Sequence, residues 1–431
     1  MTSQFRYGVS ALIAAMVAGL VACGGGGGGS STLTSSILNL KLSDPFTAVL
    51  IGDGTGLWVD NSGGGGDGGG DGGGGAGDGE FVKVSMLFPN TSRPTGTLTW
   101  TILRSQYGKT NATGTLTIQK DASAVGGYKV TEVNGVPSSL ATQGNFFVST
   151  SGQLSGTLPL PIGTGGAIKN SLFSGFRFKD IASAPTDMSD YAGQYGFGII
   201  DSNLSGAPFT EVDGGQFTLN ADGSGRICPQ TFIYSTTCAN GINVKATFDD
   251  PSSRNLVHIK ETATQGTFAS GHATGIDMLA VVRKFGSSGV SFSGDAVFMV
   301  GGAAAATGAV YGSRLAASPA DPTTLIGAWN YTYTSISNNA SLGSASNQVA
   351  IANVGGAIKV SAGTLAGCNA SSNTISAGPV NGVFQSLDGN SNQVFTIQLD
   401  TDFLVVVTGG AEIGFARRYS ADPANAPCQP G

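Results

Sequence analysis

Short runs in which apolar and polar residues alternate, separated by turn residues, fill most of the chain beyond residue 80. The runs are rich in Val, Ile, Thr, Phe and Tyr, as in Thr97–Leu103, Thr113–Gln119 and Gln216–Asn220. Because the side chains of a β-strand point alternately to its two faces, this pattern predicts strands with a buried face. Gly, Asn, Asp and Ser separate the runs at intervals of about 8–12 residues, a spacing typical of β-sandwiches and up-and-down barrels. The pattern predicts an all-β protein.

One segment of the chain recurs 134 residues further on. Residues 184–197 and 318–331 share a Pro, an Asp, a Gly and an aromatic residue at each of the two alternate positions after that Gly. The apolar stretches 311–317 and 415–421 also match, and each carries a late Arg. Repeats of this kind indicate modules of similar fold. We therefore expect two or three antiparallel up-and-down barrel or sandwich modules in tandem, each able to fold separately.

Gly327-Ala328-Trp329 stands at the head of the first strand of the last module. This spacing resembles the Gly-x-Trp start of lipocalin-like up-and-down barrels. The resemblance implies a Trp that packs across the barrel floor and a Gly that lets a neighbouring chain approach closely. Gly193-Gln194-Tyr195 is a version with Tyr in place of Trp, and Gly56-Leu57-Trp58 is a candidate third copy displaced by a Gly-rich insert.

Five residues of the last module fall on one face of its predicted first strand, because strand side chains alternate. They are Leu325, Gly327, Trp329, Tyr331 and Tyr333. Two interpretations are open for this face. It is either part of the buried core or an aromatic wall around a cavity, since eight-stranded barrels sometimes hold one small ligand.

The first 23 residues predict export to the cell envelope. Arg6 gives a basic start, and the apolar stretch Val9–Val21 is too short to span a bilayer as a permanent helix. The stretch ends in Leu20-Val21-Ala22-Cys23, which resembles the lipobox of bacterial lipoproteins. That resemblance implies cleavage before Cys23 and acylation of its thiol and new amino end. Because Gly24 rather than Asp follows, it also implies an outer-membrane location, periplasmic or surface-exposed; the alternative is an ordinary secretory signal.

Glycine marks the expected linkers. The chain has 69 Gly among 431 residues, about 16% where about 7% is usual. The tracts 24–29 and 63–79 predict a disordered tether and a flexible linker or loop. A calcium β-roll is disfavoured, because Asp67 and Asp71 are surrounded by Gly and lack the apolar neighbours that each turn must bury. The expected order is a signal peptide (1–22), the lipidated Cys and tether (23–36), short strands with a Gly/Asp-rich linker or loop (37–80), and β modules at 81–185, 186–320 and 321–431.

Four cysteines remain once Cys23 is acylated, and an even number in an exported chain predicts two disulfides. Three pairings are open, and proximity in the sequence favours Cys228–Cys238 and Cys368–Cys428. A zinc site is disfavoured, because the chain has no CxxC pair and only two His. We expect no metal and no cofactor.

The charge pattern and the missing motifs argue against several classes of function. A net charge of −6 with only 11% charged residues argues against nucleic-acid binding, which needs clustered Lys and Arg. The Gly-x-Ser-x-Gly nucleophile elbow is absent, and His258 and His272 are interpreted as a strand residue and a turn residue. Carboxylates that could act in pairs sit at turns or strand edges, where solvated acids normally lie; they are Glu211, Asp213, Asp249, Asp250 and Glu261. No catalytic residue is predicted.

Three functions stay open on these observations. The first is a lipid-anchored, non-enzymatic protein that binds a small apolar ligand or another envelope protein. The second is a structural envelope lipoprotein with filled barrels, and the third an envelope hydrolase with paired carboxylates. An open aromatic cavity would favour the first and filled barrels the second. Two carboxylates about 5–10 Å apart in a cleft would favour the third.

Overall fold

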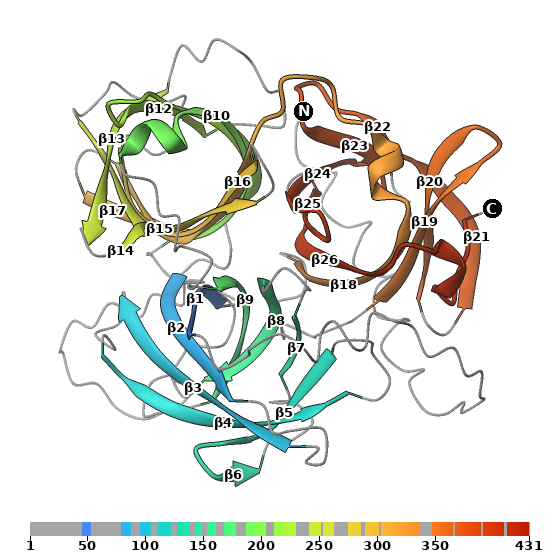
Figure 1. The fold of residues 1–431 in the computed structure, drawn as a ribbon, viewed down its shortest axis with the longest axis horizontal. Coiled ribbons are helices and arrows are strands. Elements are labelled where there is room, and N and C mark those ends of the chain that lie inside the picture. The colour runs from blue at the N-terminus through green and yellow to red at the C-terminus, as the bar shows by residue number, and fades with distance from the viewer. Residues whose placement is uncertain are drawn as a thin grey trace, which may run out of the picture.

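A computed structural model describes part of the chain, and its description is confined to these residues: 45–52, 79–87, 95–104, 111–121, 127–137, 144–148, 153–160, 168–177, 187–203, 211–229, 241–250, 253–262, 275–285, 289–300, 303–335, 347–364, 367–388, 391–408 and 412–430. These residues are mostly β-strands, with three short 3₁₀ turns, and they form three antiparallel barrels in tandem (Figure 1). The predicted all-β class with tandem barrel modules is confirmed.

Barrel 1 is a ring of eight strands in the order β1-β2-β3-β4-β5-β7-β8-β9, closed by pairing of β1 with β9, while the short β6 pairs only with β5. Its strands are β1 (Pro45–Gly52), β2 (Gly79–Leu87), β3 (Thr95–Arg104), β4 (Thr113–Lys120), β5 (Gly127–Val133), β6 (Val136–Pro137), β7 (Asn145–Val148), β8 (Gln153–Leu160) and β9 (Lys169–Arg177). Since β1 belongs to this ring, the first module begins before residue 81, where sequence analysis placed its start. Ile51 pairs with Gly79, so the Gly-rich tract connects two neighbouring strands of one barrel.

Barrel 2 is a closed ring of eight strands in chain order. It starts with the 3₁₀ turn η4 (Met188–Tyr191) and continues through β10 (Gly193–Asn203), β11 (Glu211–Leu219), β12 (Ser224–Pro229), β13 (Ile242–Asp250), β14 (Ser253–Glu261), β15 (Gly275–Phe285), β16 (Gly289–Val300) and β17 (Ala303–Arg314). Hairpin connections of this kind need only local turns. Asn220 to Ser224 form one of these turns, with Gly223 at a φ of +84°.

Barrel 3 repeats this plan. It contains η5 (Pro322–Leu325), β18 (Gly327–Ser335), β19 (Asn347–Val354), β20 (Ala357–Thr364), β21 (Gly367–Thr374), β22 (Ser376–Ala377), β23 (Val383–Leu387), β24 (Gln393–Asp400), β25 (Phe403–Thr408), β26 (Glu412–Ser420) and η6 (Pro423–Asn425). β21 and β22 follow one another directly, and they pair with β20 and β23 respectively. The two pieces therefore act as one strand that completes the ring.

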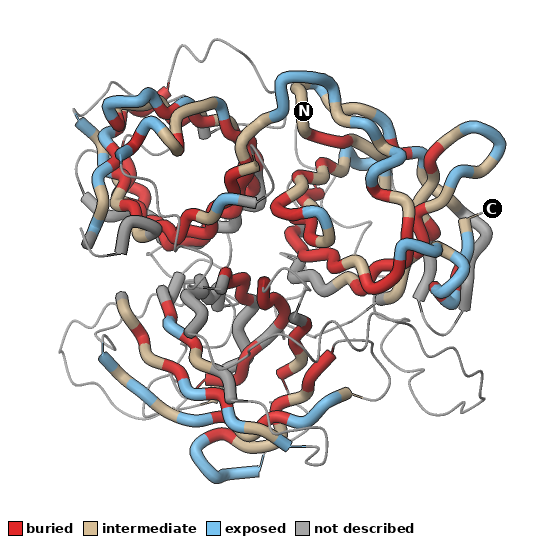
Figure 2. Tube along the Cα trace, in the orientation of Figure 1, coloured by how far each residue is buried: buried red, intermediate tan, exposed pale blue. Residues whose placement is uncertain are grey.

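Each barrel has its own apolar core, and a fourth apolar cluster lies between the barrels, where buried residues face one another across the junction (Figure 2). We call this fourth cluster the seam. Its members are Phe176 of barrel 1; Leu279, Val281, Ala309 and Tyr311 of barrel 2; and Val383, Phe395, Ile397, Leu399, Phe403, Val405, Val407, Ile413 and Phe415 of barrel 3. β25 is thus apolar on both faces: Phe403, Val405 and Val407 pack in the seam, while Leu404 belongs to the core of barrel 3.

Candidate functional site

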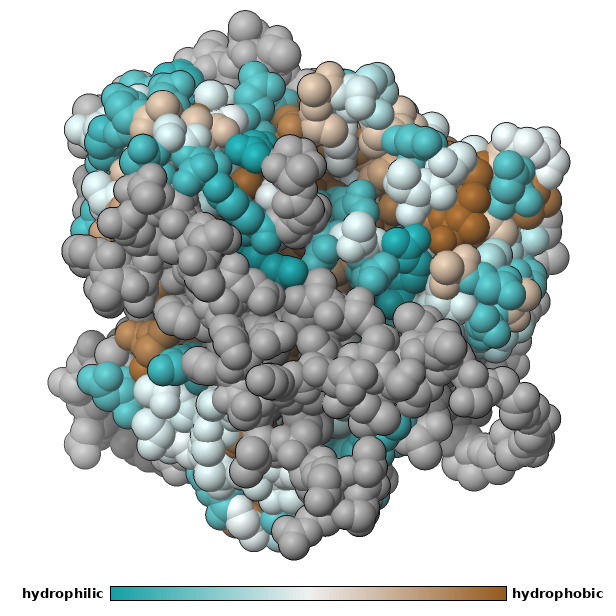
Figure 3. Space-filling model, in the orientation of Figure 1, coloured by the Kyte–Doolittle hydropathy of each residue, from teal (hydrophilic) through white to brown (hydrophobic). Residues whose placement is uncertain are grey.

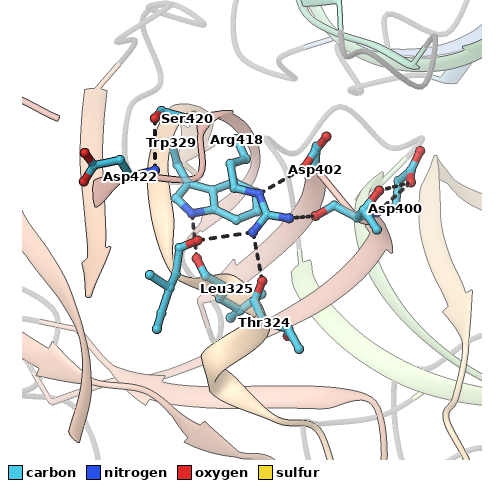
Figure 4. Close-up of polar contacts among 10 residues, drawn as sticks. Thr324, Leu325, Trp329, Asp400, Asp402, Arg418, Ser420 and Asp422 are labelled. Atoms are coloured by element: carbon cyan, nitrogen blue, oxygen red, sulfur yellow. Dashed lines mark hydrogen bonds and ion pairs between the residues drawn. The ribbon is translucent and has the colours of Figure 1, made fainter. Parts of the chain in front are cut away.

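The floor of barrel 3 is built around Trp329, the first aromatic residue of β18 (Figure 4). Its side chain is fully buried, and its indole Nε1 donates a hydrogen bond of 2.9 Å to the carbonyl oxygen of Leu325 in η5. The turn itself begins at Asp321, whose carboxylate accepts a hydrogen bond from the Thr323 backbone N–H at 3.0 Å. Hydrogen bonds from the Thr323 side chain and backbone lower the pKa of Asp321. The turn η5, which Asp321 caps, thus directs the Leu325 carbonyl toward the Trp329 ring and fixes the position of that ring.

Arg418 closes this floor from the last strand. Its guanidinium carbon lies 5.2 Å from the centre of the Trp329 ring, a cation–π distance. The Arg418 Nη1 donates to the carbonyls of Thr324 and Ile326 at 3.0 and 3.2 Å, and Nε donates to Asp402 at 2.9 Å. The same side chain therefore covers the aromatic ring and satisfies the carbonyls at the end of η5, which would otherwise lack partners.

Barrel 2 has the same floor, displaced by 134 residues in the sequence. Tyr195 is buried and its hydroxyl donates to the carbonyl of Tyr191. Burial raises the pKa of the Tyr195 phenol well above its ordinary value. Arg314 of the last strand donates to the carbonyls of Asp190 and Ala192 at 3.3 and 3.1 Å. The sequence repeat therefore encodes the same arrangement in both barrels: a buried aromatic residue bonded to a turn carbonyl, with an arginine from the last strand bonded to the same turn.

Glycine is required at the first position of both floors. Gly193 and Gly327 have φ angles of +151° and +153°, which side chains rarely adopt. A Cβ at these positions would lie 2.6 Å from Cδ of Arg314 and 2.7 Å from Cδ of Arg418. The close approach expected from the Gly-x-Trp resemblance is thus present. In barrel 1, Gly56-Leu57-Trp58 lies outside the described residues, and the register instead places Phe46 opposite Arg177.

The interior of barrel 2 is filled by apolar side chains. Two voids of about 10 Å³ each lie inside it, and Phe217 and Phe292 line both of them. Their rings meet edge to face with centroids 5.8 Å apart. A void of this size corresponds to about one water molecule, and an apolar void stays dry. In barrel 3, Trp329 is fully buried on that face, Tyr331 is half-buried, and the Tyr333 side chain lies outside the described set. Leu325 is also fully buried, but it lies in η5 and not on the strand where sequence analysis placed it.

No protein-family model matches the chain, and no curated protein matches its sequence significantly. Among solved structures, a protein of unknown function from the DUF3598 family of Nostoc punctiforme is similar. It is 10% identical over 67% of this chain and 100% of that protein, with a TM-score of 0.21. A TM-score this low does not establish a shared fold.

Of the carboxylates singled out from the sequence, the structure describes the side chains of Asp249 and Glu261, which lie at opposite ends of the β13–β14 pair. Asp249 is exposed and lies 3.9 Å from Nδ1 of His258 on the outer face of barrel 2. Asp277, which sequence analysis did not single out, contacts the other ring nitrogen at 2.7 Å and Lys260 at 3.1 Å. Glu261 ends β14. The remaining candidates, Glu211, Asp213 and Asp250, lie in β11 and β13, and their side chains are outside the described set.

Within the described residues, no group of three or more His, Cys, Asp or Glu side chains is placed to hold a metal ion. No helix among them has the length and apolar character needed to cross a bilayer. On the face drawn in Figure 3, the described residues are mainly hydrophilic or weakly polar, with a few hydrophobic patches. The exposed large apolar residues in the described part are Val136 and Leu387.

The predicted cysteine sites are only partly described. Cys228 lies half-buried in β12, and Cys428 is buried just after η6, which covers the outer face of β18 and β19. Cys368 lies in β21, but its side chain is outside the described set, as are Cys23 and Cys238. Cys228 and Cys428 are each disulfide-bonded, and the cysteine with which each one pairs stays a prediction.

We expect peptide mapping under non-reducing conditions to link Cys228 to Cys238 and Cys368 to Cys428. In the chain-entropy model, the second pair closes a loop of about 60 residues worth roughly 4 kcal/mol, while the first contributes a little under 3 kcal/mol. Reduction should therefore destabilise barrel 3 more than barrel 2. A peptide that joins a cysteine of barrel 2 to one of barrel 3 would contradict the pairing.

Proposed function

We propose that this protein is a non-enzymatic, lipid-anchored scaffold of the bacterial outer membrane, in which solid barrels present their outer surfaces. The observation that carries the scaffold role is the apolar filling of barrel 2: the two voids lined by its described residues measure about 10 Å³ each, too small for an organic ligand. The floors support the same role, because Tyr195 and Trp329 with their arginines close one end of their barrels.

The lipid anchor is the second part of the proposal, and the Leu20–Cys23 sequence supports it. One acyl chain gives only marginal membrane binding, whereas two or more anchor a protein stably. A partner of such a scaffold would be another envelope component that contacts its outer surface.

A binding assay with an apolar fluorescent probe tests the solid interior. The full chain is expected to give no saturable increase in probe fluorescence. Phe292→Ala should create a cavity beside Phe217, and this variant should bind the probe. The matched control is Lys245→Ala, which shortens an exposed side chain on the outer face of β13. Saturable stoichiometric binding to the unaltered chain would overturn the scaffold role in favour of ligand binding.

Replacement of Cys23 tests the anchor. Cys23→Ala is expected to abolish labelling by radioactive palmitate and to leave the protein uncleaved at this site. The physical reason is the loss of the only thiol in the Leu20–Cys23 sequence that can carry the thioether-linked lipid. Continued palmitate labelling of the Cys23→Ala protein would show that the anchor lies elsewhere.

A further inference from the structure

A single arginine touches all three barrels at the seam. Arg283 extends from β15 of barrel 2, on the face that carries Leu279 and Val281. Its Nη1 lies 2.9 Å from the Oδ2 of Asp400 in barrel 3, and the two side chains are only 10% and 4% exposed. Its guanidinium carbon lies 6.0 Å from the ring centre of Phe176 in barrel 1.

The local structure of barrel 3 prepares Asp400 for this contact. The pairing of β24 with β25 shifts register between Gln398 and Asp400, so Asp400 lies opposite Phe403 of the seam. A bulge of this kind re-aims a side chain. The other carboxylate oxygen, Oδ1, accepts hydrogen bonds from the Thr401 backbone N–H and hydroxyl, at 2.6 and 3.0 Å. Contacts within barrel 3 therefore orient the Asp400 carboxylate independently of Arg283.

Most other seam side chains are apolar, and apolar contact alone does not specify orientation. Two more charged residues are buried beside them: Asp295 of β16 near Tyr311, and Arg417 of β26 near Tyr128 of barrel 1. Tyr311 and Phe415 meet edge to face across barrels 2 and 3 with centroids 4.8 Å apart. Barrels 1 and 2 share a polar contact in which Ser293 Oγ donates to the Ser174 carbonyl at 3.2 Å. Faces built from Phe, Val, Ile and Leu can pack in several rotations at similar free energy. Because the Arg283–Asp400 pair joins two barrels directly, any rotation that separates its partners buries an unmatched charge on each side.

We infer that Arg283 and Asp400 form a latch that selects one arrangement of the three barrels, rather than supplying the stability of their association. Buried ion pairs add little net stability, because desolvation offsets the attraction, but loss of one partner is strongly unfavourable. The inference is independent of the lipid anchor and of what the scaffold presents.

The test uses the full chain, in which the exposed residues Thr247 of barrel 2 and Leu387 of barrel 3 are replaced by an azide-bearing amino acid. A spin label is then attached to each azide. Pulsed electron paramagnetic resonance then measures the distance between the barrels. The unaltered chain should give one narrow distance distribution. The double variant Arg283→Met with Asp400→Leu should remain folded by circular dichroism and give a broadened or multiple distribution. It should also unfold at a higher temperature than either single variant.

The matched control, Lys245→Met, alters an exposed pair with Asp222 on the outside of barrel 2 and should leave the distribution unchanged. A folded double variant with the single distance of the unaltered chain would overturn the inference. A double variant that does not fold would also overturn it, because the pair would then be required for stability rather than for orientation.

Discussion

Replacing Trp329 with alanine is expected to destabilise the chain by about 3–5 kcal/mol. The Trp329 side chain is fully buried, packs beneath the Arg418 guanidinium and holds the carbonyl of Leu325. Its removal opens a large cavity at the barrel floor and leaves a turn carbonyl without its donor. Chemical denaturation of the full chain, followed by circular dichroism, measures the change in the free energy of unfolding.

The homologous floor of barrel 2 supplies the control for this substitution. Tyr195→Phe keeps the ring and removes only the hydroxyl that donates to Tyr191. Its expected cost is about 0.5–1.5 kcal/mol, the net contribution of one hydrogen bond. If Trp329→Ala costs no more than Tyr195→Phe, the floor does not contribute to the stability of barrel 3 in the way described.

The floors were predictable because their residues are close together in the sequence. Asp321, Gly327 and Trp329 fall within nine residues. An Asp, a Gly and an aromatic residue recur 134 residues earlier, with Tyr195 in the place of Trp329. Local spacing fixes a capped turn followed by a strand, and so the repeat predicted two similar barrels. The role of Arg418 was visible only as a recurrent late Arg, since its contact with the turn requires the last strand to lie beside the first.

The seam and the membership of β1 could not be predicted in the same way. β1 pairs with β2 across the Gly-rich tract, and no local pattern says which strand lies beyond such an insert. Arg283 and Asp400 are 117 residues apart and belong to different barrels. One signal was present for the seam: Phe403–Val407 is apolar at consecutive positions, a pattern typical of strands buried on both faces.

Barrel 3 expressed alone is expected to aggregate and to bind a hydrophobic dye, although sequence analysis predicted that the modules fold separately. Residues 318–431 without the other barrels would expose the seam side chains of β24 to β26, among them Phe403, Val405 and Phe415. Each such side chain contributes about 1.5–3 kcal/mol when fully buried. An apolar face of this extent favours aggregation in a monomeric protein. Size-exclusion chromatography and binding of a hydrophobic dye, after expression in an oxidising compartment, measure the outcome.

A surface variant of the same fragment separates exposure of the seam from a wrong module boundary. Phe403→Thr, Val405→Thr and Phe415→Thr keep β propensity but make the outward face polar. This fragment should be monomeric, strand-rich and cooperative in unfolding, because the interior core around Trp329 and Leu404 is intact. The same three substitutions in the full chain should instead weaken packing between barrels. If the unaltered fragment is already a monomer that unfolds cooperatively and binds no dye, the seam is a contact between independent modules rather than part of one folding unit.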